Sequence, residues 1–529
     1  MAAAAAVPQS GEGATLSKGW GLALFVVVIG AFMSILDSSI VNIAIPTIEN
    51  VFNVNTQGAE WVVTIYILAL GVVVPISSWL GDKYGLKQIY LFSLMVFTAG
   101  SALCGASWSV GVLSGFRVLQ ALGGGLIMPT TMSLVYRMVP RDRIGTAMGF
   151  WGLALIMAPA IGPTLGGYLV QYVDWRLIFY VNVPIGIIGV LLAMRYLPNI
   201  PGHPVGRLDW AGMATAAAGL FGILLALSEG QTWGWTSEGI LLLLIASVGF
   251  MVLFVYLQLT GREPLLDLRV FRYGSYALTN ILSMVVMVGM YAGVFYVPLF
   301  LQTVSGYGAM ETGLIMMPAA LVTAIFMPLA GRLYDRVGAR WPVFVGLLFM
   351  GYGTYVFHNL STATPTFVVA EWLMIRSVGM GLAMMPLTTA GMSAVPNPKI
   401  GAASSVNNIL QRVSGAFGLA ALTGVLQDQT RAFASTLSAA YTPGSAGASL
   451  MAGMGHLIQG AGMTAPGAQL LGAYLITGEI ARDAFVLAID NVFVLTAALT
   501  LVGAVVALFV KTYRQQQAQG ERDGALVMD

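Results

Sequence analysis

The chain has 529 residues, of which 57% are hydrophobic and only 9% are charged, against about 25% charged residues in an ordinary soluble domain. A mean hydropathy of +0.83 excludes a water-soluble globular protein. The formal net charge of +2 gives no reason to expect a nucleic-acid partner, and the single cysteine, Cys104, excludes an intrachain disulfide and a cysteine-based metal site.

Long apolar runs follow one another from the N-terminus onwards, and a membrane-spanning helix needs about 20 such residues. Backbone groups in lipid must be paired within their own segment, so runs of this length predict helices rather than barrel strands. We therefore expect an all-α polytopic membrane protein with about 14 spans. The predicted spans are 21–48, 59–80, 88–107, 110–133, 144–170, 176–197, 208–228, 238–260, 274–301, 313–330, 341–358, 365–389, 403–427 and 484–510.

These spans group into two bundles of six helices with two helices inserted between them. Lys18 is the only base among the first 19 residues, so the first apolar run is expected to remain as a helix rather than to be removed as a signal peptide. The predicted parts are a cytoplasmic segment 1–20, a bundle 21–197, the inserted helices 208–260, a second bundle 274–510 and a cytoplasmic tail 511–529.

Basic residues in the connections predict the orientation, because cytoplasmic loops retain Lys and Arg. With the N-terminus inside, 18 of the 24 basic residues fall in inner loops or tails, and the outer loops hold only Arg176, Arg431 and Arg482. Both termini are therefore expected to be cytoplasmic, and the protein to lie as a monomer in the lipid bilayer of a bacterial cell membrane.

The connection between the last two predicted spans, residues 428–483, is unusually long and is rich in Gly and Ala. It is too short for two further spans with their turns. We expect an external loop, and the alternative is a hairpin that dips toward the outer mouth of the protein.

A ten-residue pattern, small-x-Leu-x-Asp-basic-x-Gly-x-basic, occurs after the second span at 78–87 and again after the tenth at 331–340. A second pair is Arg117, followed by glycines in span 4, and Arg376, followed by glycines in span 12. Duplicated halves of this kind enclose a site near the middle of the bilayer and rock against each other.

With these motifs the chain resembles the major facilitator superfamily, in particular its 14-span drug:proton antiporters, over essentially its whole length. Segment 78–87 is similar to the family's motif A, with Ser78 in place of Gly and Leu86 in place of Arg, and 331–340 is closer to the consensus. Segment 36–46 looks like a motif of the 14-span group.

Two further motifs carry the resemblance. Arg117-x-x-Gln120-x-x-Gly123 is similar to motif B, and Gly162-Pro163-x-x-Gly166-Gly167 is similar to the antiporter motif C, with Ala158 where its leading Gly would stand. Small residues every four positions let another helix approach closely, and prolines permit bending. The resemblance implies that this segment is a hinge and a seal against leakage.

The acidic and basic residues of the repeated loop lie at helix ends near the membrane surface. We expect them to act as latches of one conformation rather than as substrate ligands. The residues of this predicted switch are Asp82, Lys83, Gly85, Asp335, Arg336 and Gly338.

Asp37 and Arg117 are charged residues deep inside predicted spans, where an ionised group costs at least about 2.5 kcal/mol without a partner or a cavity. Asp37 lies roughly 22 Å from the inner end of its span, and Arg117 about 10 Å from the outer end of an oppositely directed span. Their depths nearly coincide, so they are expected to face one another. A permanent ion pair that only fixes packing is one interpretation. The other is proton coupling, because burial raises and a nearby Arg lowers the pKa of a carboxyl group.

Further residues are candidates for the lining of the predicted cavity. The candidate substrate or cation contacts are Glu371, Asp490 and Glu60 and the aromatic residues Tyr66, Tyr291, Phe295 and Tyr296. Arg376 and Arg412 are expected to secure helix contacts rather than to bind substrate. The three histidines, His203, His358 and His456, fall in loops or at helix ends.

These observations predict a proton-coupled antiporter that exports lipophilic, cationic drugs or amphiphiles by alternating access. It would use the proton gradient and no cofactor, since the sequence has no phosphate-binding loop for ATP. The alternative is a proton-coupled symporter or a uniporter for a small nutrient. No His, Cys and acid constellation favours an enzyme or a metal site, and an Arg in a Gly-rich helix argues against a passive channel.

Overall fold

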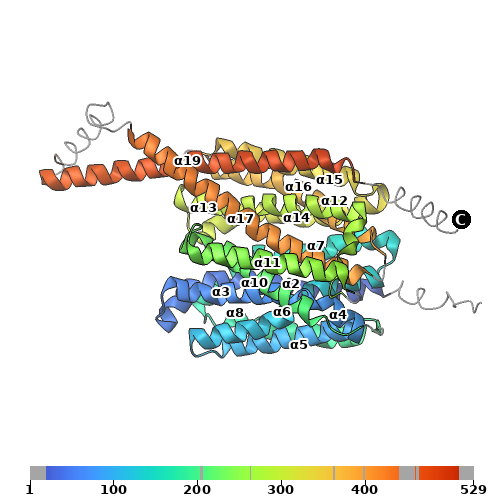
Figure 1. The fold of residues 1–529 in the computed structure, drawn as a ribbon. Helices are drawn as coiled ribbons and strands as arrows, with labels where there is room; N and C mark the ends of the chain where they lie inside the picture. Colours follow the sequence, from blue (N-terminus) through green and yellow to red (C-terminus); the bar gives the residue numbers. More distant parts are fainter. Residues whose placement is uncertain are drawn as a thin grey trace, which may run out of the picture.

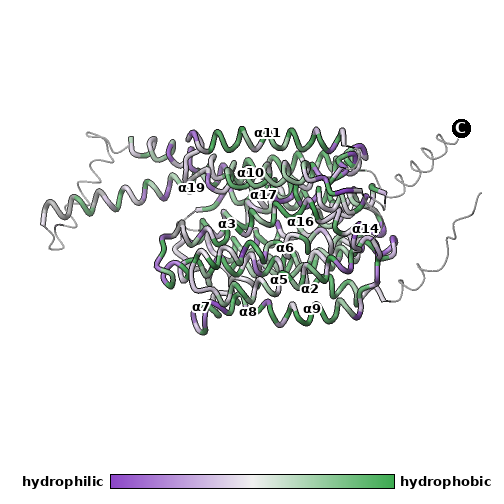
Figure 2. The backbone as a smooth tube through the Cα atoms, turned by 60° about the horizontal axis from the view of Figure 1, so that its bottom comes forward, coloured by the Kyte–Doolittle hydropathy of each residue, from purple (hydrophilic) through white to green (hydrophobic). Residues whose placement is uncertain are grey.

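The computed structural model describes residues 19–202, 206–261, 264–361, 364–396, 399–439, 459 and 464–510. Within these residues the chain is almost entirely helical and contains no strand (Figure 1). The long helices run side by side, and strongly hydrophilic residues concentrate at the two ends of the bundle (Figure 2). The predicted all-α polytopic membrane fold is confirmed.

The N-terminal group of helices ends before residue 200. Its members are α2 (Trp20–Phe52), α3 (Thr56–Val73), α4 (Ile76–Tyr84), α5 (Leu86–Gly105), α6 (Val110–Met138), α7 (Ile144–Tyr172), α8 (Leu177–Tyr180) and α9 (Asn182–Tyr196). A short 3₁₀ turn, η1 (Arg141–Arg143), precedes α7.

The inserted pair and the C-terminal group follow. The inserted helices are α10 (Trp210–Trp233) and α11 (Glu238–Thr260), and the 3₁₀ turn η2 (Leu268–Arg272) leads out of them. The C-terminal group consists of α12 (Gly274–Tyr291), the π-helical turn η3 (Ala292–Tyr296), α13 (Val297–Thr303), α14 (Ala309–Val337), α15 (Arg340–Tyr355) with η4 (Val356–Asn359), α16 (Thr366–Ser393), α17 (Ile400–Ala439) and α19 (Ala465–Ala507).

Every predicted span overlaps a helix or a broken helix pair. In the described part of the chain, 12 helices are long and apolar enough to cross a membrane, and the bent pair α3 and α4 would be a thirteenth. The remaining helix, α15, has only 16 residues. The number of 14 spans therefore stays a prediction.

The predicted loop 428–483 is wrong at both of its ends. Helix α17 continues to Ala439 and α19 already begins at Ala465, and in Figure 1 both helices project beyond one end of the bundle. Hydropathy marks where a chain leaves the membrane, but an Ala-rich segment with few breakers continues as a helix beyond that point. The alternative for 428–483, a hairpin that dips toward the outer mouth, stays a prediction, because most of residues 440–463 lies outside the described residues.

Two helices are interrupted where the sequence or the packing requires it. Pro75 separates α3 from α4, whose axes differ by 54°, since proline cannot continue the backbone hydrogen bonds of a helix. In the C-terminal group the break between α12 and α13 is the π-helical turn η3.

The glycines of the repeated motif adopt backbone conformations that favour glycine. Gly85 ends α4 with φ +91°, and Gly338 ends α14 with φ +80°. Positive φ is strained for residues with a side chain and is common in the glycine that terminates a helix. This part of the motif therefore stops the helix and starts the next one, α5 or α15.

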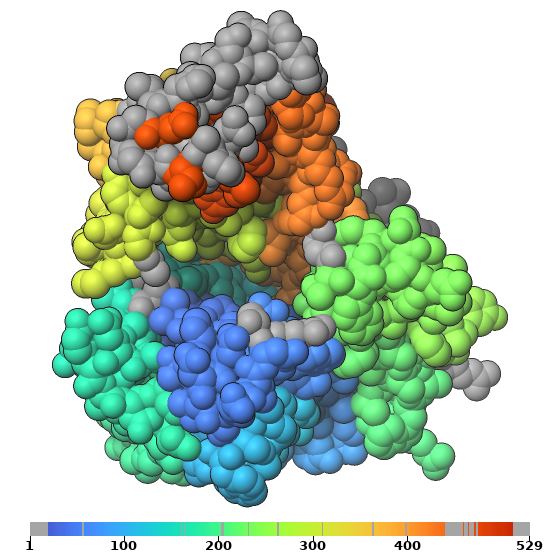
Figure 3. All heavy atoms as spheres, turned by 90° about the vertical axis from the view of Figure 1, so that its left-hand side faces the viewer, coloured from blue at the N-terminus to red at the C-terminus, as the bar shows by residue number. Residues whose placement is uncertain are grey.

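The two groups meet closely at the end of the bundle where α7 begins and α14 ends, which we call the closed end. Ser77 and Ser405 share a hydrogen bond of 2.9 Å, and Ser404 donates to the carbonyl of Pro129 at 3.0 Å. These contacts join α6 and the segment around α4 to α17. At the opposite, open end, Figure 3 shows a hollow between the blue N-terminal group and the yellow and orange C-terminal group.

The inserted pair lies against one seam between the groups. Leu224 and Leu225 of α10 are buried in one apolar cluster with Leu68 of α3 and Ala416 of α17. Helix α11 packs on α10 and leaves most of its apolar side chains exposed, which is expected for a helix whose outer face meets lipid.

Candidate functional site

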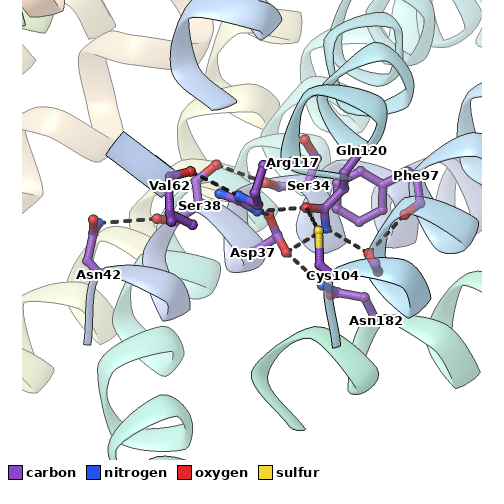
Figure 4. A network of polar contacts seen from close by, with 11 residues as sticks. Ser34, Asp37, Ser38, Asn42, Val62, Phe97, Cys104, Arg117, Gln120 and Asn182 are labelled. Atoms are coloured by element: carbon purple, nitrogen blue, oxygen red, sulfur yellow. Dashed lines mark hydrogen bonds and ion pairs between the residues drawn. The ribbon is translucent and has the colours of Figure 1, made fainter. Parts of the chain in front are cut away.

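Asp37 of α2 lies in the centre of a buried network of polar side chains (Figure 4). Its carboxylate accepts from Arg117 Nη1 at 2.5 Å, and both side chains are 0% exposed. Gln120 Nε2 donates to the other carboxylate oxygen at 2.8 Å and Asn182 Nδ2 at 2.9 Å. All of these neighbours donate, so the arrangement fits an ionised carboxylate.

Arg117 of α6 is held by further partners besides the ion pair. Its Nη1 also donates to Gln120 Oε1 at 2.7 Å, and its Nε to the carbonyl of Val62 in α3 at 3.3 Å. The ring of Tyr66 covers the guanidinium with its centroid 3.8 Å from Cζ. A desolvated cation over an aromatic face contributes about 2 kcal/mol or more.

The sequence placed Asp37 and Arg117 at one depth, and the structure brings them into contact. It also adds two partners that the sequence analysis did not assign. Gln120 follows Arg117 by one helical turn, so the motif itself contained the signal. Asn182 stands in the middle of the apolar run 176–197, where an unexplained amide is a sign of an internal hydrogen bond.

The aspartates of the repeated loop both bond to residues at the closed end. Asp335 of α14 crosses to the N-terminal group and accepts from the backbone N–H of Gly145 at 2.8 Å, from that of Thr146 at 2.9 Å and from the Thr146 hydroxyl at 2.7 Å. Asp82 bonds to Arg137 of its own group at 3.0 Å, and it also lines the small cavity at the closed end together with Gly401 of α17. Asp335 thus joins the two groups directly at the closed end.

The other residues of the predicted switch are peripheral. The side chains of Lys83 and Arg336 are exposed, and Lys83 Nζ lies 4.3 Å from the ring centroid of Trp79. Gly85 and Gly338 act through the backbone, as their positive φ shows.

The small residues of α7 pack against α2. Ala158 is fully buried, and the Ser39 hydroxyl donates to the carbonyl of Pro159 at 3.4 Å. A Cβ on Gly162 would lie 2.5 Å from Ser39 Oγ, and one on Gly166 2.7 Å from a side-chain carbon of Ile40. A Cβ on Gly167 would meet no atom within 4 Å, and the side chain of Pro163 lies outside the described residues.

We expect the substitution Gly162→Ala to destabilise the protein by about 1–3 kcal/mol, because the added methyl group overpacks the contact between α7 and α2. The measurement is the melting temperature of the purified protein, followed by tryptophan fluorescence. Gly167→Ala is the matched control and should melt like the unmodified protein. Adding Ser39→Gly to Gly162→Ala should restore stability, and a double variant as unstable as the single one would contradict this packing.

The other acidic candidates do not join the Asp37 network. Glu371 and Glu60 are exposed near the ends of α16 and α3. Asp490 in α19 is partly buried, and its Oδ1 has no hydrogen-bond partner in the described part of the protein. Asp490 follows directly on Ile489, which packs in the apolar cluster with Phe357 and Leu373. These placements give Glu371 and Glu60 surface positions, and the predicted ligand roles stay predictions.

The aromatic candidates separate into two kinds. Tyr66 covers Arg117, and Tyr291 lies partly buried with its ring against Gly415 of α17. Tyr296 is buried and bonds to the Thr423 hydroxyl at 2.8 Å, which joins η3 to α17. Phe295 is 42% exposed and packs edge-on against Tyr296.

The second arginine of the repeat pattern, Arg376, has no carboxylate partner among the described residues, in contrast to Arg117. Its guanidinium donates to the carbonyls of Gly289 and Met290 and to the Thr354 hydroxyl. The pattern of helical hydrogen bonds changes at η3, directly after these carbonyls, and π-helical turns of this kind leave carbonyls available at the junction. Arg376 thus secures helix contacts, as the sequence predicted.

A bundle of membrane-spanning helices in two groups, with a hollow at one end and a buried Asp–Arg network inside, defines a polytopic membrane transporter. The family model of the Major Facilitator Superfamily matches residues 27–419, and the chain belongs to this family. It is therefore an integral membrane transport protein and not an enzyme.

Named relatives of this chain include multidrug transporters. It is 35% identical over 407 residues to the multidrug resistance protein Stp of Mycobacterium tuberculosis (strain CDC 1551 / Oshkosh). The matched region covers 77% of this chain and 75% of Stp. It is 31% identical to the multidrug transporter protein MdtP of Bacillus subtilis (strain 168), over 75% of this chain and 74% of MdtP. The fold matches that of the proton:xylose symporter XylE with a TM-score of 0.61 at 13% identity, over 95% of this chain and 99% of XylE.

Proposed function

We propose that the protein is a proton-coupled antiporter that exports lipophilic drugs or related amphiphiles by alternating access. It would use the proton gradient without a cofactor and work as a monomer in the plasma membrane. The observation that carries the proposal is the buried Asp37–Arg117 pair, in which each side chain is 0% exposed. The names of Stp and MdtP support the export of more than one drug. The cationic charge that the sequence predicts for the substrate is untested.

The network supplies the group that a proton would occupy. In this conformation Asp37 is surrounded by donors, and a proton on it would compete with the bonds from Arg117 and Gln120. Arg117 and Gln120 lie on α6 and Asn182 on α9, in the same group as α2, so coupling requires α6 or α9 to shift against α2 within the N-terminal group when the two groups tilt. A change in their distance changes the proton affinity of the carboxyl group, and this links protonation to conformation.

The orientation follows from charge. The closed end carries Arg137, Arg332 and Arg336 together with the η1 arginines, and such clusters are retained on the cytoplasmic side. The closed end would thus face the cytoplasm with both termini, and the hollow in Figure 3 would open outward. This is the conformation in which an exporter releases substrate and takes up a proton.

The test uses inside-out vesicles from cells that make the protein, and an uncharged lipophilic fluorescent probe. We expect the probe to accumulate only when the vesicle interior is acidic, and to leave when an ionophore collapses the gradient. Vesicles without the protein are the control. Flux that ignores the gradient would indicate a channel or a uniporter, and accumulation with an alkaline interior would indicate symport; either result would overturn the proposal.

A further inference from the structure

The two halves of the protein differ in how their buried arginines are compensated. Arg117 pairs with Asp37. In the C-terminal group neither Arg376 nor Arg412 has a carboxylate within ion-pair distance, counting the described residues. The N-terminal group therefore contributes a neutral pair to the interior, and the C-terminal group contributes two uncompensated guanidinium groups.

Arg376 satisfies its donors on backbone carbonyls, but Arg412 does not. Its Nε is buried and has no hydrogen-bond partner within the described ranges. A guanidinium is an acceptor-free group with five donors, and a buried donor left unsatisfied costs about 1–3 kcal/mol. The expectation that Arg412 merely secures helix contacts therefore does not account for its surroundings.

The position of Arg412 along α17 places it just beyond the closed end. Residues 400–408 of α17 are all buried, and 409–413 are all partly exposed. The first stretch packs on α4 and α6, where Ser404 bonds to Pro129 and Ser405 to Ser77. Arg412 thus occupies the first helical turn of α17 that is freed from this contact, toward the open end.

Two tyrosines from opposite halves flank Arg412. Tyr291 of α12 has its ring against Gly415, less than one turn further along α17, and both Tyr291 and Tyr66 of α3 interact electrostatically with the Arg412 guanidinium. The Tyr66 hydroxyl is buried without a hydrogen-bond partner in the described structure, and so is Arg117 Nη2 beneath its ring. Arg412 Nε and Arg117 Nη2 can only donate, and the Tyr66 hydroxyl can donate as well as accept, so acceptor atoms of a ligand could pair with all three.

Asp37, the proposed proton site, restricts the charge of a ligand that could supply acceptors to these donors. A cation would be repelled by Arg412 and by Arg376. An anion would be attracted to them, but it would also attract a proton to the nearby Asp37, and ligand and proton would then tend to move together rather than in exchange. An uncharged polar group with acceptor oxygens satisfies the donors without either effect.

We propose that Arg412, with Tyr66 and Tyr291, binds the polar end of the exported molecule, and that this end is an uncharged group with acceptor oxygens, such as an ester or amide, rather than a cation. This assignment rests on the proposed export function, and it deepens it by naming the substrate class. It reverses the cationic preference expected from the sequence.

The test is equilibrium binding to the purified full-length protein in detergent, without any proton gradient. Three fluorescent probes share one lipophilic body and end in a methyl ester, a trimethylammonium or a carboxylate group. We expect the ester to bind about tenfold or more tightly than the trimethylammonium probe, since the latter loses the charged hydrogen bond and meets like charge. Arg412→Gln should weaken ester binding about tenfold and abolish this discrimination.

Arg412→Lys and Arg431→Gln complete the set. Lysine keeps the charge, so Arg412→Lys should still reject the trimethylammonium probe, and it serves in place of Arg412→Gln if that variant does not fold. Arg431 is exposed on the same helix, and Arg431→Gln should bind all probes like the unmodified protein. Equal or tighter binding of the cation, or ester binding that folded Arg412 variants leave unchanged, would overturn the proposal.

The carboxylate probe separates an acidic from an uncharged substrate. We expect that it binds to the purified protein but is not accumulated by inside-out vesicles with an acidic interior, whereas the ester probe is accumulated. Accumulation of the carboxylate in preference to the ester would overturn the uncharged assignment. Because binding is measured without a gradient, a failure of proton exchange would leave the binding results intact and would count against the export proposal alone.

Discussion

Asp37→Asn is expected to abolish accumulation driven by the proton gradient, reducing it to the level of vesicles without the protein. The amide has the shape of the carboxyl group but cannot exchange a proton. Removing one member of a buried ion pair can cost about 3–5 kcal/mol, so the melting temperature is measured alongside transport. Gln120 Oε1 and the carbonyl of Val62 still accept from Arg117, and we expect the variant to fold.

The double variant Asp37→Asn with Arg117→Gln distinguishes coupling from packing. It removes both charges, so the stability lost in the single variant should be regained. If Asp37 and Arg117 were only a permanent structural pair, transport would return with stability. We expect stability to return and gradient-driven accumulation to stay absent. Transport by either variant at the unmodified rate would refute the role of Asp37.

The sequence predicted this pair for a clear physical reason. Few charged residues occur within long apolar runs, each is costly without a partner, and residue counting gives their depths from the fixed rise of a helix. Asn182 could have been found by the same argument, because it is a lone amide in an apolar span. What residue counting cannot give is the direction of a side chain around its helix, and this decides that Glu371 and Glu60 are exposed.

The repeated motif shows a second limit. Segments 78–87 and 331–340 match in pattern, and the equivalent glycines adopt the positive φ expected of helix ends. The partners of the aspartates are not part of this pattern: Asp335 accepts from backbone N–H groups across the interface, and Asp82 bonds to Arg137. Backbone donors are present at every helix start, so no residue type in the sequence marks which one a distant carboxylate will cap.

The prediction that 428–483 is a loop is wrong at its two ends for a related reason. Hydropathy indicates where lipid contact ends, but it does not indicate whether the backbone continues as a helix in water. The partners of Arg376, which are the carbonyls of Gly289 and Met290, could not be predicted from the sequence either. Partners of this kind depend on the π-helical turn that follows, and turns of that type have no sequence signature comparable to proline or glycine.

Asp335→Asn is expected to open the closed end. Gly145 and Thr146 are the second and third residues of α7, so their N–H groups have no partner within the helix. The carboxylate of Asp335 caps them and also faces the positive end of the helix dipole. A hydrogen bond to a charged group contributes about 1.5–3 kcal/mol, so weakening this cap should shift the equilibrium away from the present conformation by about tenfold or more.

The opening is measured with one reporter cysteine in a Cys104→Ser background. Thr130→Cys suits this purpose, because Thr130 is 2% exposed and its hydroxyl has no hydrogen-bond partner in the described structure. It also lines the small cavity at the closed end together with Ser77 and Ser405. In Asp335→Asn, a membrane-impermeant thiol reagent supplied from the cytoplasmic side should label the reporter about tenfold faster.

Asp142→Asn is the matched control, because Asp142 lies at the same end of the bundle but is exposed and contacts only its neighbour Arg143 among the ion pairs of the described residues. Its labelling rate should equal that of the background protein. The same reasoning predicts slower export by Asp335→Asn, since a transporter that returns to the outward-facing state less often completes fewer cycles. Unchanged labelling in Asp335→Asn would mean that the serine contacts of α17 close this end without the carboxylate. Asp335 would then not be part of the conformational switch.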